Sequence, residues 1–273
     1  MNLVNGKSSS SISIFDRGFL YGDGIFETIL VVKKQPQNLD AHIKRIKNGC
    51  KILKIKNLDI NLLRKHINKC LKDISNCVLS INITRGTAKK RGYNINMGEV
   101  KPNIILATSS IPKYPTENSQ NGIKTKFLKT SISESNILSK IKHTNRLEQV
   151  LATSEITVAH PELILCDKYG YIIEGISSNI FFIKNSVFYT PHIENSGVDG
   201  VMKSLVTKVL EKNNFKVKSK KIKKNTFKSF DGAFFCNSIR LIWNIKSICS
   251  HKYKTNENIK NLINIIFLLK FLN

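Results

Sequence analysis

The spacing of hydrophobic and polar residues predicts strands and amphipathic helices along the whole chain. SISIF at 11–15 and GIFETILVV at 24–32 alternate as strands do, and the glycine-rich DRGFLYGDG between them predicts a hairpin turn. Apolar residues at spacings of three and four predict helices at 39–53 and 58–74. Three more strands are expected in CVLSINITRG, NIILATS and GIKTKFLKT. The two prolines of IPKYP, at 111–115, then suit a linker.

A second series of elements follows this linker. NRLEQVLATSEITVA predicts a helix at 145–159, with one stripe formed by Leu147, Val150, Leu151 and Ser154. The other expected elements are hairpins at 162–175 and 178–191, a helix at 198–213, strands at 232–238 and 241–248, and a terminal helix at 261–273. Since 273 residues exceed the usual size of one domain, we expect two α/β lobes, residues 1–112 and residues 113–273.

Charge is the most unusual feature of the composition. The formal net charge is +25, which in another protein would favour a nucleic-acid or acidic-membrane partner. Lysines are spread over nearly every segment, and the densest run, at 216–228, has few aromatic residues between its lysines for base stacking. A solvated basic surface is therefore favoured, and no nucleic-acid partner is expected. A basic nucleic-acid-binding protein without cofactor stays open as an alternative.

The sequence shows no pattern typical of a membrane span, a signal peptide or a metal site. No stretch approaches the ~20 apolar residues of a membrane span, and MNLVNGKSSS has no signal-peptide core, so a cytoplasmic protein without membrane contact is expected. The cysteines form no CxxC pair, and no histidine lies at ligand spacing from a cysteine or another histidine. We expect neither a metal site nor a disulfide framework.

Lys142 is the first residue with a candidate chemical role. In SKIKHTNRLEQVL it stands beside the apolar Ile141, just ahead of the predicted helix. Partial desolvation there favours the neutral, nucleophilic amine that forms a Schiff base with a carbonyl cofactor. Considered alone, one lysine among so many is expected on the surface.

Glu174 lies in the apolar strand YIIEGISSN. A lone carboxylate in such a strand is costly unless it meets a cation or a hydrogen-bond donor, and a protonated pyridine nitrogen is such a partner. The alternative is a glutamate of an edge strand that faces water.

A phosphate-binding segment is the third candidate. ENSGVDGVMKSLV places glycines and Asp199, a candidate N-cap, before a helix, where free backbone N–H groups bind anions. Further donors are available from the side chains of Arg45, Ser178, Asn237 and Ser238. A plain helix cap and an exposed Arg45 are the alternatives. A lysine, an anion and a phosphate cup are together what pyridoxal phosphate requires of a protein.

The order of these motifs resembles the class IV aminotransferase superfamily, fold type IV among pyridoxal-phosphate enzymes. The resemblance runs from Phe15 to about Trp243 and is carried by FDRGFLYGDGIFETI, HIKR, ITRG followed by RGY, KHTNRLEQVLA, EGISSNIFF, VFYTP, GVDGVM and FFCNS. It implies a D-amino acid aminotransferase-like α/β fold (α+β, two-lobed) with pyridoxal 5'-phosphate between the lobes. It also implies a homodimer.

The resemblance assigns roles residue by residue. Lys142 would form the Schiff base, Glu174 would face the pyridine nitrogen and Arg45 would bind the phosphate. The rest of the phosphate cup would come from the backbone amides of Val198 and Asp199 and from Asn237 and Ser238. Arg91 and Tyr93 would lie on the loop that faces the substrate's carboxylates.

Two stretches, KHTNRLEQVL and RGY, bear on the substrate. They are similar to the lyase branch of the superfamily, which splits 4-amino-4-deoxychorismate into 4-aminobenzoate and pyruvate for folate synthesis. The cofactor residues are shared with transaminases of branched-chain and D-amino acids, so a transaminase is the alternative.

Overall fold

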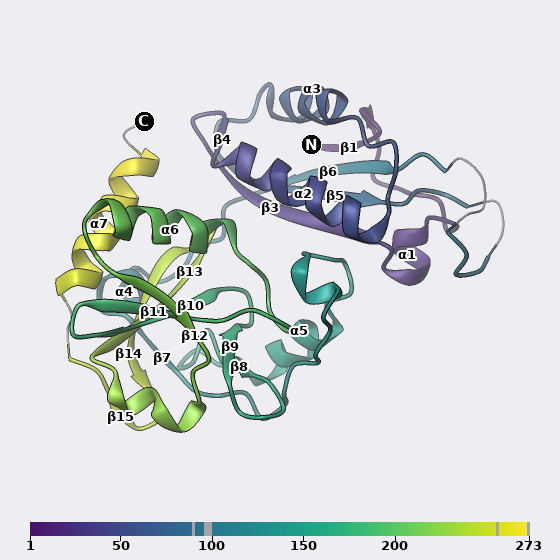
Figure 1. Cartoon of the computed structure of the whole chain (residues 1–273). Helices are drawn as coiled ribbons and strands as arrows, with labels where there is room; N and C mark the ends of the chain where they lie inside the picture. Colours follow the sequence, from purple (N-terminus) through teal and green to yellow (C-terminus); the bar gives the residue numbers. More distant parts are fainter. Residues whose placement is uncertain (89–90, 96–99, 255–256, 272–273) are drawn as a thin grey trace. The chain divides into compact units, whose positions relative to one another are not determined.

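The computed structural model describes residues 1–88, 91–95, 100–254 and 257–271 (Figure 1). The chain divides into two compact units. The first unit comprises Met1–Pro112 and Ile141–Arg146, and the second comprises Lys113–Lys140 and Leu147–Asn273. Residues 141–146 were predicted in the second lobe. They pair with β3 (Gly24–Val32) and so belong to the first unit.

The first unit is built on an antiparallel sheet of six strands in the order β2-β1-β6-β5-β3-β4. The strands besides β3 are β1 (Asn2–Val4), β2 (Lys7–Ser8), β4 (Gln35–Pro36), β5 (Cys77–Thr84) and β6 (Asn103–Ser109). Strand β3 pairs with β5 from Gly24–Thr84 to Val31–Cys77. This long register fixes which residues of β3 face each side of the sheet.

Two amphipathic helices cover this sheet (Figure 1). Helix α2 (Leu39–Leu53) packs on β3, and helix α3 (Ile60–Leu71) packs on β1 and β6. A Cβ at Gly49 of α2 would lie 2.9 Å from Ile25 Cγ2, so this glycine permits the close approach of helix and strand. The predicted helices at 39–53 and 58–74 are confirmed, with the second one shorter at both ends.

The predicted hairpin at 11–32 is wrong. Residues 11–15 form no strand, and instead Arg17–Tyr21 form a short helix, α1. Asp16 caps this helix, since its Oδ1 accepts the N–H groups of Gly18 at 2.7 Å and Phe19 at 3.3 Å. The serines before it bond to nearby backbone, as Ser9 Oγ does to Ser11 O at 3.1 Å, and these local bonds compete with strand pairing.

The second unit contains a mixed sheet with the path β12-β11-β10-β13-β14-β15, to which β7 adds beside β14. The β11–β12 and β14–β7 pairs are parallel and the others are antiparallel. The bounds are β7 (Ile123–Thr125), β10 (Asn179–Lys184), β11 (Val187–Pro191), β12 (Val217–Lys220), β13 (Gly232–Asn237), β14 (Leu241–Ile248) and β15 (His251–Lys252). A separate two-stranded sheet joins β8 (Ile164–Cys166) and β9 (Ile172–Gly175).

Both faces of this mixed sheet are buried. Alternate residues of β10 serve two hydrophobic clusters, since Ile180 and Phe182 belong to one and Phe181 and Ile183 to the other. The second cluster lies under α6 (Val201–Lys212) and α7 (Glu257–Phe271), the helices predicted at 198–213 and 261–273. The last two residues of the predicted terminal helix lie outside the described residues.

The helix predicted at 145–159 is shorter than expected. Helix α5 spans only Leu147–Ala152 and continues as the 3₁₀ turn Thr153–Glu155. Thr153 Oγ1 donates to Val150 O at 2.6 Å, and Ser154 Oγ donates to Leu151 O at 2.7 Å, so side chains replace the next helical N–H groups. The predicted stripe is not core, because Leu147 is 76% exposed.

The remaining short elements are α4 (Thr116–Gln120) and the 3₁₀ turns Leu138–Lys140 and Lys224–Ser229. Of the predicted strand at 122–130 only β7 forms. Within the described ranges, no helix combines the length and apolar character needed to cross a bilayer.

The cysteines give a first testable prediction. All six are free, and burial raises the pKa of the Cys50, Cys166 and Cys236 thiols to about 12. Because the thiolate is the reactive form, we expect a disulfide reagent at pH 8 to modify one thiol rapidly in the folded protein, the exposed Cys249. Cys249→Ser should remove the fast phase. A second fast thiol in the folded protein would contradict the expectation.

Candidate active site

Strand β3 anchors the segment that carries Lys142. Phe26 N–H donates to Lys142 O at 2.9 Å, and Thr144 N–H donates to Gly24 O at 3.0 Å. Thr144 Oγ1 adds a bond to Gly22 O at 2.7 Å. The Nζ of Lys142 lies 4.1 Å from the ring centroid of Phe26. The half-buried amine is thus held beside an aromatic face, so the alternative of an ordinary exposed lysine does not describe it.

The next residue of β3, Glu27, holds the guanidinium of Arg45. Arg45 Nε donates to Glu27 Oε1 and Arg45 Nη2 donates to Glu27 Oε2, both at 2.6 Å. His42 Nδ1, one helical turn before Arg45, lies 2.6 Å from Glu27 Oε2. The Arg45 side chain is only 15% exposed, so the alternative of a solvent-facing arginine is wrong.

Glu27 is ionised in this cluster. Burial by itself raises the pKa of the carboxyl, but the hydrogen bonds and positive charge of Arg45 and His42 outweigh it and hold the pKa below its ordinary value. Successive residues of a strand point to opposite faces. Phe26 therefore contacts Lys142 on one face of β3, and Glu27 binds Arg45 on the other.

Arg91 and Tyr93 lie on an exposed loop of the first unit. Arg91 is exposed and Tyr93 is 84% exposed, while the two lysines before Arg91 lie outside the described residues. Gly92, between them, donates its N–H to Tyr21 Oη at 2.9 Å. Its carbonyl accepts from Arg17 Nη1 at 2.7 Å. The loop backbone is therefore tied to helix α1.

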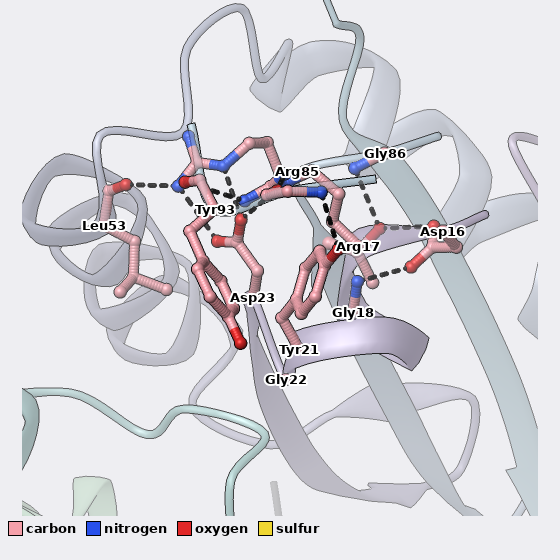
Figure 2. A network of polar contacts seen from close by, with 12 residues as sticks. Asp16, Arg17, Gly18, Tyr21, Gly22, Asp23, Leu53, Arg85, Gly86 and Tyr93 are labelled. Atoms are coloured by element: carbon pink, nitrogen blue, oxygen red, sulfur yellow. Dashed lines mark hydrogen bonds and ion pairs between the residues drawn. The ribbon is translucent and has the colours of Figure 1, made fainter. Parts of the chain in front are cut away.

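A shared carboxylate connects this loop to the sheet (Figure 2). Asp23 Oδ2 accepts Arg17 Nε at 2.9 Å and Arg85 Nε at 2.6 Å, and its Oδ1 accepts Arg85 Nη2 at 2.9 Å. Arg85 also donates to the carbonyls of Leu53 and Lys54, which end helix α2. Both guanidinium groups are almost fully buried, so the bridge is a structural part of the fold.

In the second unit, Glu174 and Val198 are in direct contact. Glu174 is 5% exposed, so a glutamate facing water is excluded. Its Oε2 accepts the N–H of Val198 at 2.8 Å, which is a different partner from the phosphate predicted for that amide. Gly197 has φ +87°, and a Cβ there would lie 2.7 Å from Ile173 Cγ2, so only glycine fits this turn.

The SSN turn after β9 meets the end of β13. Asn237 Nδ2 donates to Ser177 O at 3.1 Å, which places Asn237 and Ser238 next to Ser178 along this turn. Asn237 Oδ1 accepts the N–H of Arg240 at 2.7 Å and so closes its own turn. Beneath it, the buried Glu162 accepts from the side chains of Ser177 and Arg240. Three loops distant in sequence thus share one polar framework.

The start of helix α6 differs from its prediction. The N-cap is Gly200 and not Asp199, and no side chain caps the helix. Asp199 instead pairs with Lys203 at 3.1 Å. A Cβ at Gly200 would lie 2.0 Å from Asn179 Oδ1, and Asn179 Nδ2 donates to Val198 O at 2.8 Å, so this loop is packed closely against β10.

These groups suit pyridoxal phosphate. The first unit offers a lysine amine and a carboxylate-held arginine, and the second unit offers a buried carboxylate near a helix start. Ser178 Oγ is buried and has no hydrogen-bond partner among the described residues, as expected for a hydroxyl reserved for a ligand.

Several supporting residues were missed in the sequence. Glu27, Glu162 and Arg240 each make buried polar contacts with predicted site segments. The only signal was a charged residue within an apolar stretch, as in GIFETI, which reveals burial but not the partner.

Comparisons with known proteins find relatives over most of the chain. The amino-transferase class IV family model matches residues 24–248. The aminodeoxychorismate lyase of Vibrio harveyi is 29% identical over 95% of both chains. A D-alanine aminotransferase of Staphylococcus aureus is 30% identical over 79% of this chain and 77% of its own.

A solved structure extends the likeness to three dimensions. The 4-amino-4-deoxychorismate lyase of Pseudomonas aeruginosa superposes with a TM-score of 0.93 at 30% identity, over 97% of this chain and 98% of its own. Fold and sequence therefore lead to the same assignment, and the chain belongs to the class IV aminotransferase family.

Proposed function

We propose that this protein is a pyridoxal-phosphate-dependent aminodeoxychorismate lyase. It would convert 4-amino-4-deoxychorismate to 4-aminobenzoate and pyruvate, a step of folate synthesis. The observation that carries the proposal is the likeness to lyases over nearly the whole chain, at 29% identity to the Vibrio harveyi enzyme and 30% to the Pseudomonas aeruginosa structure.

Each predicted residue then has a binding role. Lys142 would bind the cofactor covalently and Glu174 would face its pyridine nitrogen. Its phosphate would be bound by Arg45 together with Ser178, Asp199, Asn237 and Ser238, whereas the Val198 amide is already bonded to Glu174. When bound, pyridoxal phosphate supplies an electron sink for a C–H bond beside the substrate's amine.

Lys142 also has a role in proton transfer. Once its Nζ is free of the cofactor, the amine can take the proton from C4 of the substrate. The balance of atoms requires no water, because the proton from C4 ends on the methyl carbon of the departing pyruvate. Loss of that side chain leaves an aromatic ring, which makes the release strongly favourable. Arg91 and Tyr93 would bind the substrate's carboxylates.

We also propose that the enzyme is a homodimer. Large apolar side chains are exposed in each unit, with Phe19 at 68% in the first and Leu147 and Leu151 at 76% and 72% in the second. Leu147 and Leu151 are four positions apart on helix α5 and so share one face, and an exposed apolar face favours association with another protein surface.

A transaminase acting on D-amino or branched-chain amino acids is the second candidate. It is favoured by the 30% identity to the Staphylococcus aureus D-alanine aminotransferase. Both reactions start with the same loss of a proton, so the cofactor residues do not separate them.

Product analysis tests the proposal. Purified protein with pyridoxal phosphate is incubated with aminodeoxychorismate, made in situ from chorismate, and both products are quantified. We expect equimolar 4-aminobenzoate and pyruvate. A parallel assay supplies D-alanine or a branched-chain amino acid with 2-oxoglutarate. Nitrogen exchange there, without aminobenzoate in the first assay, would replace the lyase with the transaminase.

A further inference from the structure

We propose that Tyr21 and Arg17 are positioning residues that clamp the backbone of the 91–95 loop and so set Arg91 and Tyr93 for the substrate. The substrate part of this inference rests on the proposed function. The clamp itself rests on geometry alone.

The clamp grips the loop at three backbone groups. Tyr21 Oη accepts the N–H of Gly92 at 2.9 Å, while Arg17 donates to Gly92 O at 2.7 Å and to Tyr93 O at 3.4 Å. Figure 2 shows the side chains of Arg17, Tyr21 and Tyr93 close together. The ring centroids of Tyr21 and Tyr93 are 5.2 Å apart. Arg17 Cζ lies 5.0 Å from the Tyr21 ring centroid, so the two clamping side chains also support each other.

Side-chain packing contributes nothing at Gly92 itself. Gly92 has φ +134°, and no described atom lies within 4 Å of the place where its Cβ would be. The side chains on both sides of it are exposed. Tyr21 and Arg17 therefore hold the backbone of Gly92 by hydrogen bonds, and not through packing of a side chain at that position.

The clamp stands on a rigid base. Asp16, which caps helix α1, accepts hydrogen bonds from Thr84 Oγ1 at 2.7 Å and Asn103 Nδ2 at 2.6 Å, so the helix is fixed to β5 and β6. Asp23 accepts hydrogen bonds from both Arg17 and Arg85 and so holds the two guanidinium groups in place. Arg17 is 3% exposed and cannot adopt other rotamers without leaving a buried charge.

The consequence concerns substrate affinity. An exposed arginine and tyrosine on a loose loop would lose conformational entropy each time they bound a substrate. A backbone fixed in advance lowers that cost without touching the cofactor. Loss of the clamp should therefore raise KM and leave kcat and cofactor binding unchanged.

The test removes one oxygen atom. Tyr21→Phe deletes the acceptor of the Gly92 N–H, and the matched control Tyr253→Phe deletes a hydroxyl that donates to Phe227 O in the second unit. Hydrogen exchange of the 91–95 segment and lyase kinetics are measured on both. For Tyr21→Phe we expect exchange and KM to rise about three- to tenfold, the effect of one lost hydrogen bond. The absorbance of bound pyridoxal phosphate and kcat should not change, and Tyr253→Phe should change neither exchange nor KM.

A second variant protects the test against a folding failure. Arg17→Lys keeps the charge beside Asp23 but loses the forked donors, and it should raise KM in the same direction. Unchanged exchange in Tyr21→Phe, or faster exchange with an unchanged KM, would overturn the inference. If the unmodified protein formed no aminobenzoate, the lyase proposal would fail, whereas faster exchange in Tyr21→Phe would still support the clamp.

Discussion

Replacing Lys142 with alanine should lower the rate of 4-aminobenzoate formation by about 10²- to 10⁴-fold or more, because a positioned proton-transfer group contributes that much alone. The variant also loses the covalent attachment of the cofactor. The backbone of the segment should stay in place, since Phe26 N–H bonds to the carbonyl of residue 142 and not to its side chain. Measurements of kcat and of the absorbance of lysine-bound pyridoxal phosphate check both effects.

The matched control for this variant is Lys124→Ala, which removes an exposed lysine from β7 in the second unit. It should retain the absorbance band and the rate. Aminobenzoate formation at the unmodified rate in Lys142→Ala would refute the assignment of this lysine. A band that survived in Lys142→Ala would show that another lysine binds the cofactor.

Helices and strands in which apolar residues recur at a regular spacing were predictable from the sequence. GIFETILVV forms β3 at 24–32, and the helix at 39–53 has the bounds that its apolar spacing indicates. In both, one pattern extends over many residues and one face is buried, so local preference and tertiary packing agree. Strand β10 was recognisable for another reason, since a continuous apolar run matches burial on both faces.

The short elements depend on local side-chain hydrogen bonds that the hydrophobic pattern does not show. Residues 11–15 alternate like a strand, yet Ile14 is 68% exposed and the neighbouring serines bond locally. The segment 145–159 has a suitable apolar stripe, but the side chains of Thr153 and Ser154 donate to backbone carbonyls at the end of its first turns. Serine and threonine side chains compete with helix or strand hydrogen bonds for nearby backbone groups. Whether the helix or strand still forms depends on whether the fold offers a surface that buries its apolar face.

The candidate site follows the same division. Motif order selects Lys142, Glu174 and Arg45 as candidates, and their roles stay a prediction. The residues that support them were missed because their partners are remote in sequence: Gly92 is 71 positions from Tyr21, and Arg240 is 78 positions from Glu162. Such pairs are created by the fold, and the sequence shows only that a charged or polar residue is placed among apolar ones.

Glu27→Gln should have the largest effect on stability. The neutral amide would leave the guanidinium of Arg45 without its anion in a site where Glu27 is 1% exposed. Breaking a buried ion pair by removing one partner costs about 3–5 kcal/mol, and we expect about 3 kcal/mol because Arg45 keeps some contact with water. Equilibrium unfolding in urea at pH 7 measures this loss. The control is Asp40→Asn, which breaks the exposed pair with Arg64 and should cost no more than about 1 kcal/mol.

The pH dependence identifies the carboxylate of Glu27 as the cause. Its pKa in the folded protein lies below the ordinary value of 4.5, so the unfolded chain takes up a proton first as the pH falls. The stabilisation by Glu27 is therefore complete above about pH 4.5 and is lost as the pH falls toward the lowered pKa. The stability difference between the unmodified protein and Glu27→Gln should accordingly shrink below that pH. A difference that stayed constant from pH 7 down to pH 3 would mean that packing around Glu27, and not its charge on Arg45 and His42, stabilises this part of the fold.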